Sequence, residues 1–512
     1  MAKHTASATR RRRTKATHAA KATHAAKATH ADHLNALRLW LLGEHGLFAS
    51  LPSHGNRSWQ PADLVWLALC WAWSPLRNLT NAFADAANDC AHMLGASPLS
   101  TYQGFMNALV GWTSHLLPPL QAALHRLMQQ IGGRFWRVDG WVPLAFDGSR
   151  SSAPSTRSNE QEFCAPNYGK GKTAKYRRKK TKGLRRRVKQ HQQNPQKPQA
   201  WITLIWHMGL RLPWTWLLGP SNSSERDHVM RMLAGKFPDD TLFCGDAGFV
   251  GYPLWSRITR RGHDFLVRVG ANVSLLTQQA KWEWVGGAKS RLVLCWPKDA
   301  SGKGLPPLRL RLMRVKLGRT KMWLLTSVLE PERLTAAQAV RFYRMRWGIE
   351  VEFRGLKQTL DRSKLCSRNA ARLLVELDWS ILAMAVAELF ALKEQLSGQE
   401  ARRADKRKRK QQRKGKQPQP RQVADPSRRS LAKTMRALRG SLRSLGSAPA
   451  EGQDLASQLR EAVTDGYARR KGKGSRRRVA NPDKKPLGDP KLRPLDREEK
   501  RKLQQPQEKA AA

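Results

Sequence analysis

The chain has 512 residues, enough for two or three domains, and 40% of them are hydrophobic, so a substantial core can form. Its 93 Lys and Arg against 39 Asp and Glu give a formal net charge of +54, which indicates a polyanionic partner such as nucleic acid. The six cysteines form no C-x-x-C pair, no apolar run reaches the length of a membrane span, and no apolar segment follows the basic N-terminus. These features argue against a disulfide framework, a cysteine zinc site, a membrane protein and a secreted protein, and they predict a cytoplasmic one.

Three segments concentrate the positive charge. Residues 1–31 hold a Lys-Ala-Thr-His-Ala-Ala repeat of low complexity, which predicts a disordered basic tail. Residues 170–197 carry 13 basic residues and no acid, which fits either a contact with DNA phosphates or a solvated loop. Residues 399–512 are predicted to be a basic, mostly disordered tail with short helices near 431–445 and 452–463. The histidines of the repeat fit a solvated linker better than a metal site: His18, His24 and His30.

Residues 32–132 are predicted to form a helical domain that binds DNA. Pro61 stands where a first-turn proline belongs, ahead of an apolar, Trp-rich helix. Ser100 and Thr101 are suited to cap a helix that either enters a DNA groove or simply packs within the domain. Helices are expected at 62–73, 78–93, 100–113 and 117–131.

From residue 133 the pattern changes to strands alternating with helices, which predicts an α/β fold. We expect a catalytic domain in two parts, 133–250 and 335–398, separated by a β-rich segment at 251–334. The expected strands are 135–138, 141–146, 201–208, 214–218, 241–244, 265–269, 282–285, 291–296, 308–315 and 321–327. The expected helices are 224–234, 335–360 and 378–394.

Three acids are candidates for chemistry. Asp147 and Asp246 each follow a short apolar run, which predicts that both lie at strand ends, where an α/β sheet binds ligands. Glu350 lies within the predicted helix 335–360. Three converging carboxylates suit two Mg²⁺ ions, because hard cations prefer oxygen ligands. Taken alone, an Asp at a strand end is more often a turn or cap residue.

The helix around Glu350 has one chemically distinctive face. At 100° per residue, four side chains fall within about 60° of arc, while Glu352 lies on the far side. The alternative interpretation is a solvent-exposed face in which Glu350 forms an ion pair with Arg346. The four residues of the face are Tyr343, Arg346, Glu350 and Lys357.

These residues resemble the Tyr-x2-Arg-x3-Glu-x6-Lys signature of bacterial cut-and-paste DDE transposases of the insertion-sequence-four family. Two further motifs, in the same order as in that family, resemble its first and second Asp motifs, and a strand at 265–268 also fits. The similarity covers roughly residues 134–395. The two motifs are Phe146-Asp147-Gly148-Ser149 and Cys244-Gly-Asp246-Ala-Gly-Phe249.

The resemblance implies an RNase H-like catalytic domain interrupted by a β-rich insertion. It implies that Asp147, Asp246 and Glu350 are the catalytic, metal-binding residues, with two Mg²⁺ ions as cofactor and Mn²⁺ as a substitute. The implied reaction is hydrolysis at the ends of an insertion sequence, followed by strand transfer of the freed 3′-OH. The implied partners are the inverted repeats at those ends, target DNA and a second copy of the chain, and the implied location is the bacterial nucleoid.

The resemblance also implies contacts with DNA. Arg346 and Lys357 would hold phosphates near the scissile bond, and Tyr343 would contact the backbone. Trp323 lies about where some relatives stack a Trp on a base flipped out of the duplex. A buried Trp on a strand is the alternative reading of that residue.

Other functions stay open at this stage. A nuclease or resolvase would cut DNA without joining it, and a domesticated or decayed copy would only bind it. A histone-like packaging protein would explain the basic tails, but it would not explain the Trp-rich, strand-and-helix pattern of residues 134–395.

Overall fold

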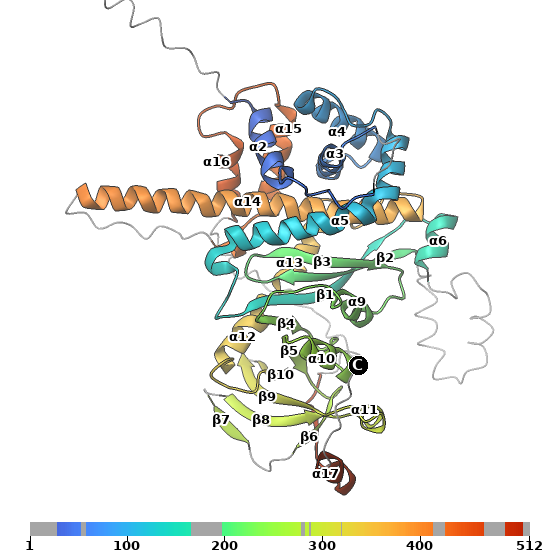
Figure 1. The fold of residues 1–512 in the computed structure, drawn as a ribbon, viewed down its shortest axis with the longest axis vertical. Coiled ribbons are helices and arrows are strands. Elements are labelled where there is room, and N and C mark those ends of the chain that lie inside the picture. The colour runs from blue at the N-terminus through green and yellow to red at the C-terminus, as the bar shows by residue number, and fades with distance from the viewer. Residues whose placement is uncertain are drawn as a thin grey trace, which may run out of the picture.

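The computed structural model describes residues 28–52, 58–164, 197–277, 282–285, 288–318, 320–412, 425–464 and 487–504. Its helical part is stacked on a long sheet (Figure 1). The expected N-terminal tail up to residue 27 and nearly all of the expected basic block at 170–197 lie outside the described residues. No helix among the described residues is long and apolar enough to span a membrane.

The N-terminal helices are α2 (His30–Leu42), α3 (Pro61–Trp73), α4 (Leu79–Leu94) and α5 (Tyr102–Gly132). Pro61 opens α3 as predicted, and the tryptophans of α3 are buried. Thr101 caps α5, which continues through Pro118 and Pro119 where we expected two helices. Helix α5 packs on the long helix α14 (Ala370–Gln412) and on the sheet, which supports the turn that the prolines weaken. The packing role of α5 is therefore observed, and its entry into a DNA groove stays a prediction.

The last copy of the N-terminal repeat belongs to the fold and not to a tail. Thr29 and Asp32 form a capping box that starts α2. His30 is buried, with Nδ1 3.2 Å from Ser441 Oγ. The expectation of a disordered, solvated segment up to residue 31 is wrong for these residues, because the cap and the buried ring anchor them.

The C-terminal region is more ordered than predicted. It contains η4 (Pro426–Arg428), α15 (Leu431–Arg443), α16 (Leu455–Arg460), β11 (Lys491–Pro494) and α17 (Arg497–Gln504). The two short helices lie where the sequence placed them, but residues 487–504 form further structure where we expected a tail. In α15, apolar side chains at helical spacing are buried between the cations: Met435, Leu438 and Leu442.

A single sheet of 11 strands runs through the rest of the molecule, in the order β11-β6-β8-β9-β10-β5-β4-β1-β2-β3, with β7 paired to β8. Its strands are β1 (Val142–Ser152), β2 (Gln199–His207), β3 (Leu212–Gly219), β4 (Thr241–Gly245), β5 (Asp264–Val269), β6 (Ser274–Thr277), β7 (Glu283–Val285), β8 (Ala288–Cys295), β9 (Leu308–Leu317) and β10 (Thr320–Thr326). Short helices lie between them: η2 (Gly133–Phe135), α6 (Arg157–Phe163), α9 (Glu225–Met232), α10 (Tyr252–Arg260) and α11 (Lys298–Gly302).

The sheet confirms an α/β fold and corrects two details of the prediction. The strand expected at 135–138 is a 3₁₀ turn followed by a tight reversal, in which Asp139 and Gly140 have φ of 50° and 86°. The β-rich segment expected at 251–334 is not separate from the catalytic sheet. Strand β5 pairs in parallel with β4, and β10 pairs with β5, so the antiparallel strands extend the same sheet.

Helices cover both faces of the sheet. Helices α12 (Ala336–Met345), α13 (Gly348–Arg354) and α14 lie on one face, where Gly348 meets Trp206 and Asp378 meets Trp216. Helices α9 and α10 lie on the other, where Thr203 Oγ1 is 2.9 Å from His228 Nδ1. Side chains of β1 therefore alternate between the two helical layers.

A buried hydrogen bond between α14 and β3 allows us to predict how the stability of the fold depends on pH. The Trp216 indole N–H donates to Asp378 Oδ1 at 2.8 Å, and burial raises the pKa of Asp378 from 3.8 to about 7. Between these values the folded chain keeps a proton that the unfolded chain releases, so stability falls as pH rises through this window. Asp378→Asn, which keeps the acceptor, is expected to be more stable than wild type above pH 7, by up to about 4 kcal/mol.

Urea unfolding of the two proteins at several pH values measures this difference. The gap should close as pH falls toward about 4, where Asp378 is protonated in both states. A gap that stays constant from acid to neutral pH would show that Asp378 does not titrate in this way.

Candidate active site

Asp147 is on β1, and Asp246 directly follows β4, the parallel neighbour of β1. Ala145 of β1 pairs with Cys244 of β4, and β4 ends at Gly245. Continuing that register by two residues brings Asp147 level with Asp246, across the spacing of roughly 4.8 Å between strands. Asp246 follows a strand end as predicted, whereas Asp147 is inside β1, which continues along β2 to Ser152. The site therefore lies where β4 ends beside a longer β1.

Each of these carboxylates accepts a hydrogen bond from a following backbone amide. Gly148 N–H donates to Asp147 Oδ1 at 2.8 Å, and Gly248 N–H donates to Asp246 Oδ1 at 2.7 Å. Burial raises the pKa of Asp147, and the nearby charges of Asp246 and Glu350 add to the rise, although Gly148 and Arg346 oppose it. Asp246 and Glu350 therefore both lie within electrostatic reach of Asp147.

The helix expected at 335–360 is interrupted. Helix α12 ends at Met345, α13 begins at Gly348, and the π-helix η3 spans Gly355–Thr359. A uniform 100° per residue does not hold across these changes, so the angles predicted for the four side chains do not apply, although Arg346 still contacts both Tyr343 and Glu350. Glu352 nevertheless lies on the far side, as predicted, where it is buried near Glu388, whereas the Glu350 side chain is 43% exposed.

Arg346 connects two of the acids. Its buried guanidinium lies 3.3 Å from Asp147 Oδ2 and 3.8 Å from Glu350 Oε1. The ion pair of the alternative interpretation is therefore present, although Arg346 is buried and also pairs with Asp147, and a role of these residues in chemistry stays a prediction. The Nε of Arg346 is buried without a hydrogen-bond partner.

The other two signature residues occupy different places. Lys357 lies on η3 and donates from Nζ to Ser149 Oγ at 2.6 Å, while burial lowers the pKa of Lys357. The Tyr343 ring is buried, with the Arg346 guanidinium 5.5 Å from its centre. Tyr343 therefore supports Arg346 in this structure, and its contact with DNA stays a prediction.

Gly348 allows the start of α13 to lie close against the sheet. A Cβ at this position would overlap the ring of Trp206, a rigid and buried side chain of β2. We expect Gly348→Ala to destabilise the fold by about 1–3 kcal/mol and to displace the start of α13, which carries Glu350. Thermal unfolding measures the first effect. Gly111→Ala is the matched control, because its Cβ would meet nothing within 4 Å inside α5, and an equal loss in both variants would contradict the steric argument.

Glu225 is a fourth carboxylate close to Asp147 and Asp246, on the side of the sheet covered by α9, that the sequence did not reveal. It is the first residue of α9, and its carboxylate occupies the space that a side chain at Gly148 would fill. Burial raises the pKa of Glu225 to about 7, and the charges of Asp147 and Asp246 contribute. Acids are common in the first turn of a helix because they interact favourably with the helix dipole, so Glu225 did not stand out in the sequence. The glycine after Asp147 was the only local signal.

Trp323 lies on β10, which β5 separates from β4 in the sheet. Its indole N–H donates to Asp489 Oδ1 at 2.6 Å, and its ring centre is 5.2 Å from that of Trp282. The ring is partly buried, so its exposure is intermediate between that of a base-stacking surface and that of a buried Trp, the two alternatives given by the sequence.

The donor chemistry of Asp147, Asp246, Glu350 and Glu225 fits a hard divalent cation, because all four offer carboxylate oxygens. Across the described residues, however, no three His, Cys, Asp or Glu side chains stand together as ligands of one ion. Arg346 instead supplies the positive charge next to Asp147 and Glu350. These acids therefore match the predicted metal in type but are not assembled around one position.

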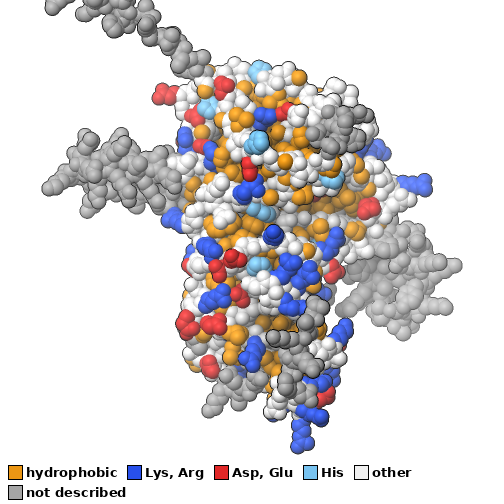
Figure 2. All heavy atoms as spheres, in the orientation of Figure 1, with side chains coloured by type: hydrophobic (Ala, Val, Ile, Leu, Met, Phe, Trp, Pro, Cys, Tyr) orange, Lys and Arg blue, Asp and Glu red, His pale blue; other side chains and the backbone are white. Residues whose placement is uncertain are grey.

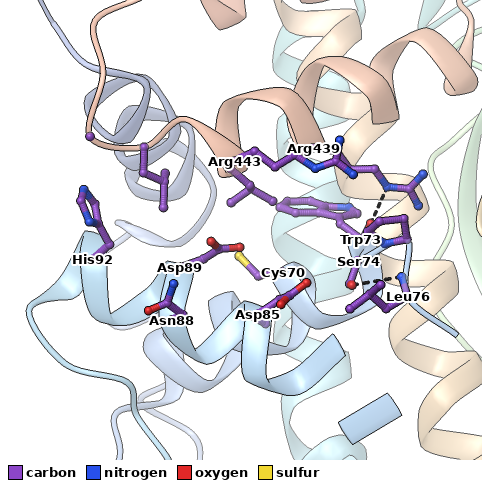
Figure 3. A pocket seen from close by; sticks show the side chains of 15 residues that line it. Cys70, Trp73, Ser74, Leu76, Asp85, Asn88, Asp89, His92, Arg439 and Arg443 are labelled. Carbon is purple, nitrogen blue, oxygen red and sulfur yellow. Dashed lines mark hydrogen bonds between the residues drawn. The ribbon is translucent and has the colours of Figure 1, made fainter. Parts of the chain in front are cut away.

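A cavity of about 450 Å³ lies elsewhere, in the helical part between α3, α4 and α15 (Figure 3). Asp85 and Asp89 of α4 and Arg439 and Arg443 of α15 line it. Burial raises the pKa of Asp89 to about 6. No residue predicted to act in chemistry lines this cavity, so it is separate from the carboxylate site.

Comparison with known proteins indicates the class of protein in which the carboxylate site occurs. Residues 143–386, just under half of the chain, match the family described as "Transposase DDE domain". This segment contains Asp147, Asp246 and Glu350, and the match supports a DDE transposase. No curated protein matches the chain. Among solved structures, the cryo-EM structure of the piggyBac transposase synaptic complex with hairpin DNA is similar with a TM-score of 0.37 and 12% identity, over 85% of this chain and 83% of that one.

Proposed function

We propose that this chain is a DDE transposase that moves a bacterial insertion sequence of the insertion-sequence-four family by cutting and pasting DNA. The observation that carries the proposal is that Ala145 of β1 pairs in parallel with Cys244 of β4, two residues before Asp147 and Asp246, and that Arg346 lies between Asp147 and Glu350. The family match over residues 143–386 supports the same class independently.

In this proposal Asp147, Asp246 and Glu350 hold two Mg²⁺ ions, and Glu225 offers a further oxygen at the same edge. The ions would polarise the scissile phosphate and activate the attacking oxygen. The chain itself contributes alignment: Gly148 and Gly248 fix the two aspartates through their amides, and the cations of Arg346 and Lys357 attract DNA phosphates. The mixed sheet with helices on both faces supports an RNase H-like catalytic domain.

The partners in this proposal are the terminal inverted repeats, the target DNA and a second copy of the chain at the nucleoid. In the view of Figure 2, Lys and Arg side chains are frequent over the part that contains the sheet. The helical domain of α2 to α5 would add a DNA contact beside the catalytic sheet.

The test incubates the chain with DNA that carries the inverted repeats flanking its gene, with and without Mg²⁺, and follows both cut and joined products. Cutting at the repeat ends and joining to a second DNA, both dependent on Mg²⁺, is the expected result. Cutting without joining would favour a nuclease or resolvase. Binding to the ends with neither product would favour a copy that only binds DNA.

A further inference from the structure

A row of four side chains crosses strands β7 to β10, outside the strands that carry Asp147 and precede Asp246. Trp284 of β7 pairs with Lys289 of β8, Lys289 pairs with Arg314 of β9, and Arg314 pairs with Trp323 of β10. Directly paired residues point to the same side of a sheet, so all four side chains share one face. Two residues further along β9, on the same face, Lys316 pairs with Lys321 of β10. We call these six residues the aromatic–cationic face; β7 to β10 lie toward the lower end of Figure 1.

The face combines exposed cations with an exposed indole. Trp284 is 71% exposed, and Arg314, Lys316 and Lys321 are exposed as well. Each tryptophan of the row has a cation over its ring: Lys289 Nζ lies 5.6 Å from the centre of Trp284, and Arg314 Cζ lies 5.4 Å from the centre of Trp323. Two neighbouring cations therefore lie between two tryptophans across four strands.

This arrangement is unfavourable for the fold alone. Lys289 faces Arg314 and Lys316 faces Lys321, and like charges placed directly opposite each other destabilise a strand pair. Glu283, the acid of β7, pairs with Ser290 and so points to the opposite face. A bound polyanion would remove the repulsion, and a flat apolar group would cover the exposed ring of Trp284.

The two tryptophans are not equivalent. Trp323 is held at its edge by Asp489 and packs against Trp282, so much of its surface is already in contact. Trp284 keeps most of its ring in solvent. This differs from the sequence-based expectation, which assigned base stacking to Trp323. The geometry makes Trp284 the available stacking surface.

We propose that the aromatic–cationic face binds unpaired nucleotides of DNA, with a base stacked on Trp284 and phosphates on Lys289, Arg314, Lys316 and Lys321. Single-stranded nucleic acid suits such a face, because every base has a π surface and its backbone carries the matching charge. A duplex offers phosphates but keeps its bases stacked within the helix. The proposal rests on the proposed function only in taking DNA as the partner.

Two variants on the opposite face of the same strands are matched controls. Leu292 of β8 is 45% exposed and Arg309 of β9 is exposed. Both alternate with residues of the aromatic–cationic face, so they point to the other side of the sheet. The basic tails are identical in all variants, so their contribution to DNA affinity cancels in each comparison.

The experiment measures binding of labelled oligothymidylate to the full chain without divalent ion, over a series of salt concentrations. Trp284→Ala is expected to weaken binding by about tenfold or more, Trp284→Tyr to restore most of it, and Leu292→Ala to change it little. Arg314→Gln should lower the slope of log affinity against log salt by about 0.7, and Arg309→Gln should leave the slope unchanged.

Three results would overturn the proposal. Trp284→Ala could bind as wild type does, Arg309→Gln could lower the slope as much as Arg314→Gln, or a duplex of equal length could compete as well as the single strand. Because no cleavage is measured, these results are independent of the proposed function. A chain that binds single strands through Trp284 but never cuts DNA would contradict the transposase and leave this inference standing.

Discussion

Replacement of Asp147 by Asn is expected to reduce DNA cleavage on the order of 10³-fold or more while leaving DNA binding nearly unchanged. The substitution keeps the shape of the side chain and the acceptor for Gly148 N–H, but it removes the negative charge next to Asp246 and Glu350. Because burial already disfavours the ionised form of Asp147, the folded state should tolerate the neutral amide. Single-turnover cleavage of end-labelled DNA measures the first effect, and a filter-binding titration measures the second.

Asp361→Asn is the matched control for that substitution. Asp361 has φ of 56°, which Asn tolerates well, and its carboxylate only pairs with Arg77 at the surface. We expect Asp361→Asn to cleave within about twofold of wild type. If Asp147→Asn cleaves as well as Asp361→Asn, Asp147 does not take part in the chemistry, and the assignment of the carboxylate site is wrong.

The sequence located the main acids because their signals are local. The apolar runs before Asp147 and Asp246 correctly indicated strands, and the order of the motifs indicated how they combine. Asp147 was still misplaced within its strand, since β1 continues along β2 to a length that only the register with β2 defines. Strand ends depend on the partner strand, which the local pattern does not contain.

The features that the sequence missed all depend on contacts distant in the chain. The start of α13 lies against Trp206 because Gly348 has no side chain, and Glu225 packs against β1 because Gly148 leaves room for it. The ordered C-terminal segment was hidden by its charge, because apolar residues such as Leu438 are diluted among many cations. Composition describes the average of a segment, whereas packing depends on which few side chains share one face.

Arg429 is the residue of that C-terminal segment with the largest expected effect on stability. Its side chain is 1% exposed, its guanidinium donates to Leu210 O at 3.0 Å and to Arg211 O, and Nη2 lies 3.7 Å from Glu388 Oε2. Glu352 of α13 lies in the same buried cluster, where burial and Glu388 raise its pKa. Arg429→Met would leave Glu388 and two carbonyls without this cation, at a cost of about 3–5 kcal/mol.

A second variant separates the loss of charge balance from the loss of packing. In Arg429→Met with Glu388→Gln, the carboxylate that Arg429 balances is removed, so the double variant should be less destabilised than the sum of the two single variants. Urea unfolding of all four proteins gives this coupling. Additive losses would mean that Arg429 acts only by filling space. The cluster also holds α13 from the side opposite to Glu350. We therefore expect Arg429→Met to cleave DNA more slowly even at temperatures where it stays folded. The double variant should recover part of the cleavage rate.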